Sequence, residues 1–398
     1  MMRVTQGVFI RQSVAAMQKK MQELQRSQEE SLTGNRILTP ADDPGGAFRD
    51  SIFSSDLSGV ESLQKTTSVA SSRLSLASEK LGMIHDNMLD ASELAVTMGN
   101  GYQGDPATMR NLSYKTENIF DDLLKNINIE ADGMPLFSGG RTRNPYDPDN
   151  PTTTTIRMRG SDTAGFSGQN NLSIATDATG NSTLDPSDAN YPGLPTSVKM
   201  TYNGGQFDVM INGDTDPSSP VAYGATMDLG WVQIDSASVP TDGQSFYFEI
   251  VPKYQGGLEY PKIKISDQQS VAGNMTGDEV MEGKNGRGQN LFGAIAGLNG
   301  ALKRADPHEV NAWIGQLEEA RGQASDSETV TGMRQVQVET VTATLDEEKT
   351  SLNEIVAKNK EADMFDVLSR MEQTIQALQV MTTSERNILG VSLVDLLR

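Results

Sequence analysis

The sequence contains no cysteine, which excludes disulfide bonds, thiolate nucleophiles and cysteine-ligated metals. Aromatic residues make up only 6% of the 398 residues, hydrophobic residues make up 36%, and the mean hydropathy is −0.44. So low a content of apolar side chains is typical of long helices, each of which buries one apolar stripe, rather than of large compact globular domains. No stretch approaches the ~20 apolar residues that a membrane-spanning helix needs, so no membrane partner is expected.

Basic residues are also in the minority, with 33 Lys and Arg against 53 Asp and Glu and a net charge of −20. Phosphate groups repel such a surface, and no cluster of basic residues offsets the repulsion. Nucleic acid is therefore not expected as a partner.

The N-terminus lacks the uninterrupted apolar segment of a cleavable signal peptide. Basic residues are spread through it, namely Arg3, Arg11, Lys19 and Lys20. If the protein leaves the cell, we expect a route that reads no such signal.

Residue patterns of catalytic and metal sites are missing as well. His85 and His308 are the only histidines, and neither lies in an HExxH motif or beside another ligand at metal-binding spacing. The glycine-rich segments lack phosphate-binding spacings, and Ser138 does not lie in a GxSxG turn. We predict that the protein is not an enzyme and has no catalytic residue, metal or cofactor. Two acidic pairs lack the glutamate that completes an EF-hand loop, Asp147 with Asp149 and Asp214 with Asp216.

The longest regular pattern runs over residues 57–98, where steps of three and four residues reach a nearly continuous apolar series. The average step of 3.5 residues is the coiled-coil period. A helix of this length spans roughly 60 Å at about 1.5 Å per residue. Its seam alternates small residues with Leu, Ile and Met, which predicts that several helices pack around it. The series is Val60, Leu63, Thr67, Ala70, Leu74, Ala77, Leu81, Ile84, Met88, Ala91, Ala95 and Met98.

Both ends of the chain carry a shorter apolar stripe at the same spacing. A helix with one stripe near a free chain end is marginal alone, so each stripe needs a partner in the same chain or in another copy. The N-terminal stripe is Ile10, Val14, Met17, Met21 and Leu24. The C-terminal stripe is Met364, Leu368, Met371, Ile375 and Leu378.

Residues 32–51, LTGNRILTPADDPGGAFRDS, predict a connector between two helices. Gly34 can end the first helix. Asp43 before Pro44 can cap the second, with proline at its first position.

The middle of the chain, residues 141–285, loses the helical period and gains Gly, Pro, Asn, Ser and Thr with short β-type runs. Two of these runs flank Asn203–Gly205, which predicts a β-hairpin. Further strands are expected at 231–234, 245–252 and 262–266. Helical patterns return from about 288, and Asp306–Pro307 starts another long helix.

The expected fold class is mainly α, with a long antiparallel helical bundle or coiled coil formed by the N- and C-terminal segments and a central, inserted β-rich domain. The expected domains are an N-terminal assembly helix, an N-terminal rod, an outer β-rich domain, a C-terminal rod and a C-terminal assembly helix. Their ranges are 1–40, 41–140, 141–285, 286–359 and 360–398.

Three segments together resemble one known family. LTGNRILTPADDPGGA resembles the N-terminal signature of bacterial flagellins and hook-associated proteins, and ADMFDVLSRMEQTIQALQVMTTSERNILGVSLVDLLR looks like their C-terminal helix. ADGMPLFSGG with DGQSFYFEIVP is more similar to the flagellar hook-associated protein 3 family than to a filament flagellin. Flagellins usually have an FNGxxLL-like turn at that point, and this chain does not.

The resemblance implies a secreted, extracellular protein of the bacterial flagellum that leaves through type III export, with an export chaperone before secretion. It implies a ring of copies at the hook–filament junction, between hook-associated protein 1 and flagellin. The two terminal stripes would then form the assembly interface, packing with each other and with neighbouring copies. An elbow motif would connect them to the outer bundle through Gly34, Arg36, Asp42, Asp43 and Pro44.

The leading hypothesis is thus a structural subunit that polymerises by coiled-coil formation of its ends. A minor flagellin of the filament itself is the alternative within the same class. A secreted enzyme carried on flagellin-like ends is the alternative from another class, although residues 141–285 contain no catalytic signature.

Overall fold

The computed structural model describes residues 4–99, 105–160, 165–166, 171–260, 262–266, 268–283 and 288–396. The segment GNGYQGDP (residues 99–106), whose glycine-rich composition predicts a turn, lies largely outside these ranges. The chain divides into two compact units, residues 1–65 with 343–398 (unit 1) and residues 66–342 (unit 2).

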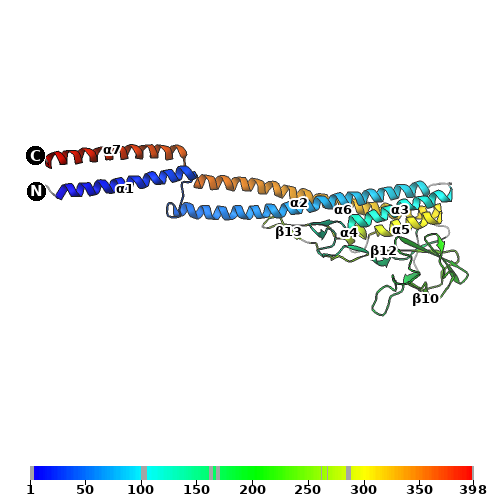
Figure 1. Ribbon diagram of the computed structural model, residues 1–398. Helices are drawn as coiled ribbons and strands as arrows, with labels where there is room; N and C mark the ends of the chain where they lie inside the picture. The colour runs from blue at the N-terminus through cyan, green and yellow to red at the C-terminus, as the bar shows by residue number, and fades with distance from the viewer. Residues whose placement is uncertain are drawn as a thin grey trace. The chain divides into compact units, whose positions relative to one another are not determined.

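Helices occupy both ends of the chain and strands occupy its middle, which confirms the predicted fold class (Figure 1). The helices are α1 (Val4–Thr33), α2 (Pro44–Gly99), α3 (Pro106–Ile127), α4 (Gly277–Met281), α5 (Leu291–Arg304), α6 (Pro307–Lys360) and α7 (Met364–Leu396). The predicted helix starts at Pro44 and Pro307 are both confirmed.

Fourteen strands lie between α3 and α4 and form four sheets within the described residues. The largest has seven strands in the order β3-β12-β6-β7-β8, with β4 also paired to β12 and β9 to β7. The strands are β1 (Glu130–Ala131), β2 (Met134–Pro135), β3 (Tyr146–Thr153), β4 (Arg157–Arg159), β5 (Leu172–Ile174), β6 (Thr196–Asn203), β7 (Gln206–Ile211), β8 (Asp214–Thr215), β9 (Val221–Ala222), β10 (Thr226–Asp228), β11 (Gln233–Ser236), β12 (Ser245–Tyr254), β13 (Lys262–Lys264) and β14 (Ser270–Ala272).

The predicted hairpin at Asn203–Gly205 is confirmed, because β6 and β7 pair antiparallel with Asn203 opposite Gln206. Gly204 and Gly205 have φ of +57° and +93°, which side chains with a Cβ rarely adopt. The strand expected at 231–234 begins two residues later, at Gln233, since Trp231 and Val232 lie in the turn after β10.

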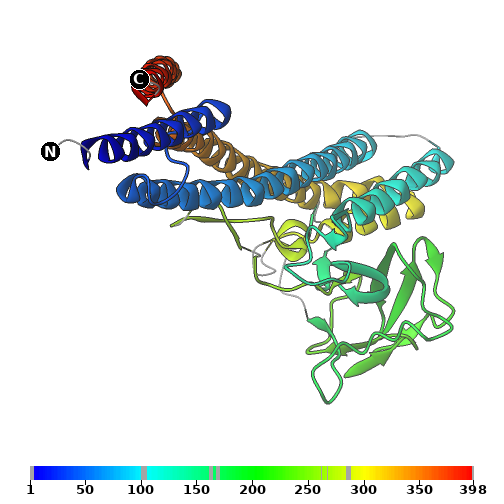
Figure 2. The ribbon, with the colours of Figure 1, turned by 60° about the vertical axis from the view of Figure 1, so that its left-hand side comes forward.

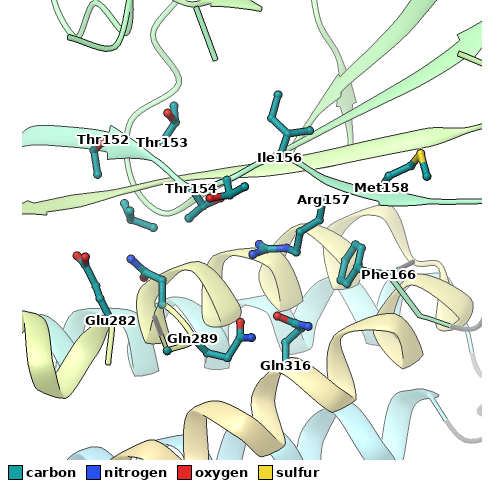
Figure 3. A pocket seen from close by; sticks show the side chains of 14 residues that line it. Thr152, Thr153, Thr154, Ile156, Arg157, Met158, Phe166, Glu282, Gln289 and Gln316 are labelled. Carbon is teal, nitrogen blue, oxygen red and sulfur yellow. The ribbon is translucent and has the colours of Figure 1, made fainter. Parts of the chain in front are cut away.

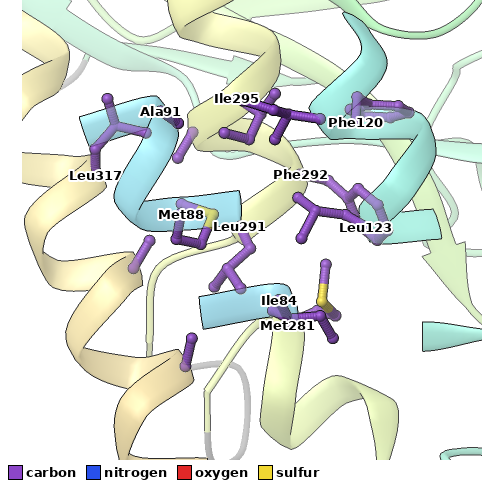
Figure 4. Packing of buried hydrophobic residues seen from close by; sticks show 14 of the residues in the cluster. Ile84, Met88, Ala91, Phe120, Leu123, Met281, Leu291, Phe292, Ile295 and Leu317 are labelled. Carbon is purple, nitrogen blue, oxygen red and sulfur yellow. The ribbon is translucent and has the colours of Figure 1, made fainter. Parts of the chain in front are cut away.

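The long apolar seam of α2 forms the centre of unit 2. From Ala77 to Met98 its residues are buried together with apolar residues of α3, α5 and α6 (Figure 4). α5 is buried along its entire length up to Leu302, so it is the innermost helix of this bundle. The prediction that several helices pack around the α2 seam is therefore confirmed.

The seven-stranded sheet is covered on both faces. Along β12, Phe246, Phe248 and Ile250 pack against the small sheet β10-β11-β5, whereas Val251 packs against the helices. The strand contacts α5 directly. Figure 2 shows the green strands on one side of the cyan and yellow helices of unit 2. Consequently, β12 is buried on both faces from Phe246 to Pro252, including the charged residue Glu249. The β-rich segment therefore shares its core with the helical bundle.

A small hairpin, β13–β14, lies on the part of α2 and α6 that belongs to unit 2. Its residues Ile265 and Val271 are buried with Ala70 and Leu74 of α2 and with Val338 of α6. The hairpin therefore adds apolar contacts to α2 and α6 outside the bundle that they form with α3 and α5.

A buried glutamate joins α6 to the sheet. Glu309 is 1% exposed, pairs with Arg304 of α5 at 2.5 Å (Nε to Oε2) and also pairs with Lys199 of β6. Burial raises the pKa of the Glu309 carboxyl, but the two nearby cations outweigh burial, so the resulting pKa is lowered.

A second glutamate lies in the same interface. Glu249 of β12 is fully buried, pairs with Arg157 and accepts a hydrogen bond from Thr154 Oγ1 at 2.6 Å. The Arg157 guanidinium lies 4.6 Å from the ring centroid of Trp313. Here burial outweighs the single adjacent guanidinium, and the pKa of the carboxyl is raised.

Candidate functional site

The first and last helices lie side by side in unit 1 (Figure 1). Ser13 Oγ donates a hydrogen bond of 2.9 Å to Glu385, and the Arg370 guanidinium donates one of 3.0 Å to Glu30. Because an early residue of α1 meets a late residue of α7 and the reverse, the two helices run antiparallel.

The seam between these helices is mostly polar. Its fully enclosed residues are Ser27 and Glu30 of α1 and Val367 and Thr374 of α7. The Glu30 carboxylate is 2% exposed and accepts hydrogen bonds from two arginines, Arg26 at 3.1 Å and Arg370 at 3.0 Å. Charge-assisted bonds to a buried carboxylate have directional geometry, so they specify how α1 and α7 align.

The predicted terminal stripes lie mainly outside this seam. Met17, Leu24, Met371 and Leu378 are half-buried, and the side chain of Ile10 lies outside the described residues. The other five are exposed, namely Val14 (43%), Met21 (60%), Met364 (40%), Leu368 (48%) and Ile375 (37%). The pairing of α1 with α7 within one chain thus leaves these five apolar side chains between 37% and 60% exposed.

Sequence reasoning missed the polar residues that fill the seam. A search for apolar residues at steps of three and four residues cannot find Ser27, Glu30, Arg370 or Thr374, because all four are polar. A signal that could have found two of them is the pair of opposite charges, Glu30 and Arg370, on the two helices expected to pair.

The elbow between α1 and α2 runs from Gly34 to Asp43 and ends at Pro44, the first residue of α2. Gly34 follows the last residue of α1 with φ of +71°, and its N–H bonds to the Glu30 carbonyl at 2.9 Å, which is a left-handed helix C-cap. The segment then runs antiparallel to the chain between α6 and α7. Arg36 N–H bonds to the Lys360 carbonyl at 2.7 Å, and Ala362 N–H bonds to the Gly34 carbonyl at 2.8 Å.

Two aspartates hold the turn that follows. Asp42 accepts hydrogen bonds from Leu38 N–H and from Thr39, and it pairs with Arg26 of α1 at 3.1 Å. Hydrogen bonds from Thr39 lower the pKa of the Asp42 carboxyl, with a smaller contribution from Arg26. The turn is thereby attached to α1.

The start of α2 is capped as predicted. Asp43 Oδ1 accepts a hydrogen bond of 2.8 Å from Gly46 N–H, Pro44 is the first helical residue, and Arg36 pairs with Asp43 at 3.2 Å. The Gly46 N–H and the Arg36 guanidinium lower the pKa of the Asp43 carboxyl. All five elbow residues therefore take part in one cluster that joins α1, α2 and the end of α6.

A polar pocket of about 600 Å³ opens between the sheet and the helices of unit 2. Figure 3 shows Thr154 and Arg157 facing Gln289 and Gln316 across it. Arg157 and Thr154 are already engaged with Glu249, so their polar atoms serve the packing of sheet against helix.

No group of three or more His, Asp or Glu side chains is arranged to hold a metal ion within the described ranges. None of the helices described combines the length and the apolar character that crossing a membrane requires. The exposed apolar residues of α1 and α7 are the main candidate for a functional surface, because they gather on a helix pair whose seam is mostly polar.

Comparison with known proteins agrees with this interpretation. Residues 10–142, about a third of the chain, match the family model described as the bacterial flagellin N-terminal helical region. The N-terminal third is thus similar to the helical region of flagellins. No curated protein matches the sequence at a significant level.

Several solved structures resemble the chain. A putative flagellar hook-associated protein from Vibrio parahaemolyticus is 11% identical, with a TM-score of 0.50, and the match covers 80% of this chain and 100% of that one. FlgL from Xanthomonas campestris is 14% identical, covers 77% and 99%, and has a TM-score of 0.39. The flagellar junction protein FlgL from Legionella pneumophila is 16% identical, covers 73% and 99%, and has a TM-score of 0.34.

The Vibrio structure establishes the fold, because it matches over its full length. Together with the N-terminal match, it confirms the flagellin and hook-associated resemblance that the sequence predicts.

Proposed function

We propose that this protein is a structural subunit of the bacterial flagellum that joins the hook-side adaptor to the filament. The observation that carries the proposal is the conjunction of a flagellin-type N-terminal region with two paired terminal helices whose apolar residues are left exposed. Exposed apolar stripes of this size on a helix pair are typical of surfaces that another protein covers. The protein acts by assembly rather than by catalysis.

In this proposal the terminal segments, 1–40 and 360–398, form the assembly region. Ile10, Val14, Met17, Met21 and Leu24 join Met364, Leu368, Met371, Ile375 and Leu378 in contacts with neighbouring copies. The elbow residues Gly34, Arg36, Asp42, Asp43 and Pro44 connect this region to the helical rod, and the β-rich segment 141–285 faces outward.

The proposed partners are further copies of the chain in a ring, hook-associated protein 1 on one side and flagellin on the other. An export chaperone holds the chain before type III secretion. The proposed location is extracellular, at the hook–filament junction.

Removing residues 364–398 tests the proposal. We expect a folded, soluble protein that no longer assembles, because α1 then lacks its antiparallel partner and half of the exposed stripe is gone. Cells that carry only this truncation should be non-motile and release flagellin into the medium. Normal assembly and motility would contradict the proposed function.

A point variant gives a milder version of the same test. Met21→Ser with Leu368→Ser removes two exposed apolar side chains and should weaken assembly without unfolding the chain. Leu258→Ser is the matched control, because Leu258 is 75% exposed in a loop of unit 2.

A minor filament flagellin is the alternative function, favoured by the N-terminal match alone. Immunolabelling separates the two functions, because a junction protein gives one band at the hook end and a flagellin labels the length of the filament. For a carried enzyme, hydrolytic activity of the full chain that is lost on mutating a defined acidic pair would be the supporting result.

A further inference from the structure

Methionine is the only sulfur-containing residue of this chain, which has 19 methionines and no cysteine. No thiol is present to react with an oxidant, so the methionine thioethers are its sulfur targets. Exposure decides which of them react, because an oxidant must reach the sulfur atom. The burial of each methionine therefore predicts where oxidation acts.

The two units shield their methionines to different degrees. Seven methionines of unit 2 are at most 6% exposed and belong to its two large apolar clusters. These are Met88, Met98, Met109, Met200, Met227, Met275 and Met281. Unit 1 has no buried methionine among the residues whose side chains the structure describes. There, Met21 is 60% exposed and Met364 is 40% exposed.

These two methionines belong to the terminal stripes and not to the contact that pairs α1 with α7. Four of the ten stripe residues are methionines, namely Met17, Met21, Met364 and Met371. The enclosed residues of the α1–α7 seam are Ser27, Glu30, Val367 and Thr374. Since none of these four is a methionine, a chemical change at Met21 or Met364 does not remove an enclosed seam contact.

We infer that Met21 and Met364 form an oxidation-sensitive site, at which a peroxide blocks assembly of the chain without unfolding it. This inference rests on the proposed function and adds a regulation to the surface that it uses. In the reaction, a lone pair of the methionine sulfur attacks one oxygen of the peroxide, so that an S–O bond forms and the O–O bond breaks. With hydrogen peroxide the other oxygen leaves as water, the thioether is oxidised to a sulfoxide, and the peroxide is reduced.

The product has the opposite character to the side chain that it replaces. A sulfoxide is polar and its oxygen accepts hydrogen bonds from water, whereas the thioether is apolar. Covering the sulfoxide with another protein removes that water, and a polar group without a new partner is unfavourable there. Oxidation therefore weakens assembly, while the shielded methionines of unit 2 keep the rest of the fold unchanged. Copies that have already assembled are protected, because their stripe sulfurs are covered.

Peptide mass spectrometry of the full chain, treated briefly with hydrogen peroxide before assembly, measures where oxidation occurs. Met21 and Met364 should form sulfoxide at least tenfold faster than the fully buried Met88. Met333 of α6 is the matched control for exposure, because it is 61% exposed against 60% for Met21 and should react equally fast. Circular dichroism should show the same helix content before and after treatment.

Assembly is then compared between treated and untreated samples of each variant. The treated unmodified chain should need at least a tenfold higher concentration to assemble than its untreated sample. In Met21→Leu with Met364→Leu, which lacks both sulfurs, treatment should change that concentration less than twofold. Met333→Leu should respond to treatment like the unmodified chain, because both stripe methionines remain. Methionine sulfoxide reductases should restore assembly of the oxidised chain.

The outcomes separate this inference from the proposed function. Normal assembly of a chain that carries sulfoxide at Met21 and Met364 would overturn the inference alone, and so would an equal loss in the double leucine variant. A loss of helix content on oxidation would also overturn it, because assembly would then fail through unfolding. Normal assembly of the untreated chain after deletion of residues 364–398 would instead overturn the proposed function.

Discussion

Glu249 and Glu309 lie in the same contact between sheet and helices, yet the pKa values of their carboxyls are shifted in opposite directions. Glu309 is flanked by Arg304 and Lys199, and these two cations hold its pKa below the ordinary value despite burial. Glu249 has Arg157 as its adjacent cation, and burial prevails there. The balance between burial and nearby cations thus sets the direction of each shift, since Arg304 lowers the pKa of both carboxyls but forms an ion pair with Glu309.

The Glu309→Gln variant is expected to lower the free energy of unfolding of unit 2 by about 3 kcal/mol or more. Gln keeps the shape of the side chain but leaves the Arg304 guanidinium, which is 3% exposed, without its carboxylate. Urea unfolding followed by tryptophan fluorescence measures this, because both tryptophans of the chain are buried in unit 2.

A matched variant, Glu117→Gln, removes the partner of Lys303 in a pair whose side chains are 30% and 28% exposed. That change should cost less than about 1 kcal/mol. Similar losses from the two variants would contradict the distinction between buried and solvent-accessible pairs.

The two glutamates should also give opposite pH dependences. A carboxyl whose folded pKa is lowered stabilises the fold above its unfolded value of 4.5, and this stabilisation is lost as the pH falls through the folded pKa. A carboxyl whose folded pKa is raised stabilises below 4.5 and loses its contribution as the pH rises through the folded pKa.

The measurement is the unfolding free energy of each variant relative to the unmodified chain. Below pH 4.5, the deficit of Glu309→Gln should shrink as the pH falls. Above pH 4.5, Glu249→Gln should improve relative to the unmodified chain as the pH rises. Deficits that stay constant with pH for both variants would show that neither carboxyl titrates differently on folding.

At the scale of the element, the elbow depends on Gly46, because the Asp43 cap of α2 leaves no room for a side chain at that position. A Cβ on Gly46 would lie 2.5 Å from both Asp43 Oδ2 and Ile37 Cδ1. Asp43 is the capping residue and Ile37 is buried, so neither can move without disturbing the turn. The neighbouring Gly45 has room, because the nearest atoms to its Cβ would lie at 3.6 and 3.8 Å.

We therefore expect Gly46→Ala to destabilise the elbow by about 1–3 kcal/mol. Gly45→Ala, in the same first turn of α2, should be neutral or slightly stabilising, because alanine has the higher helix propensity. Hydrogen exchange of the Arg36 and Ala362 amides reports on the elbow, because their N–H groups form the hydrogen bonds between the α1–α2 connector and the segment from α6 to α7. Equal exchange in the two variants would contradict the assigned role of Gly46.

The strands show which features the local sequence pattern predicts and which it does not. The β6–β7 hairpin followed from its turn residues, which is local chemistry. The two-sided burial of β12 did not, because it depends on α5 covering one face and on the β10-β11-β5 sheet covering the other. A run of apolar residues is compatible with either a one-sided or a two-sided strand until its neighbours are known.

At the scale of the whole molecule, the two units bury very different surfaces. Unit 2 has a large apolar core around the α2 seam and α5, whereas the α1–α7 seam of unit 1 is mostly polar and leaves five stripe residues exposed. Segments with few buried apolar contacts open at a low free energy.

Hydrogen exchange of the monomeric chain should reflect this difference. Amides of α1 and α7 should exchange at least a hundredfold faster than those of α5, because helix pairs with a polar seam gain little from packing. Assembly should slow exchange in α1 and α7 specifically. Equal protection of α1 and α5 in the monomer would contradict the proposed dependence of the terminal helices on a neighbour.

The sequence by itself determined the helices, their caps and the mainly α fold class, because capping residues, proline positions and the 3.5-residue period act over a few neighbouring residues. It also determined which residues of the ends are apolar. Only the tertiary structure decided that the terminal stripes lie beside a polar seam rather than in it. That arrangement depends on the hydrogen bond between Glu30 and Arg370, which are 340 residues apart in the sequence. No local sequence pattern specifies how one helix is rotated about its axis relative to another.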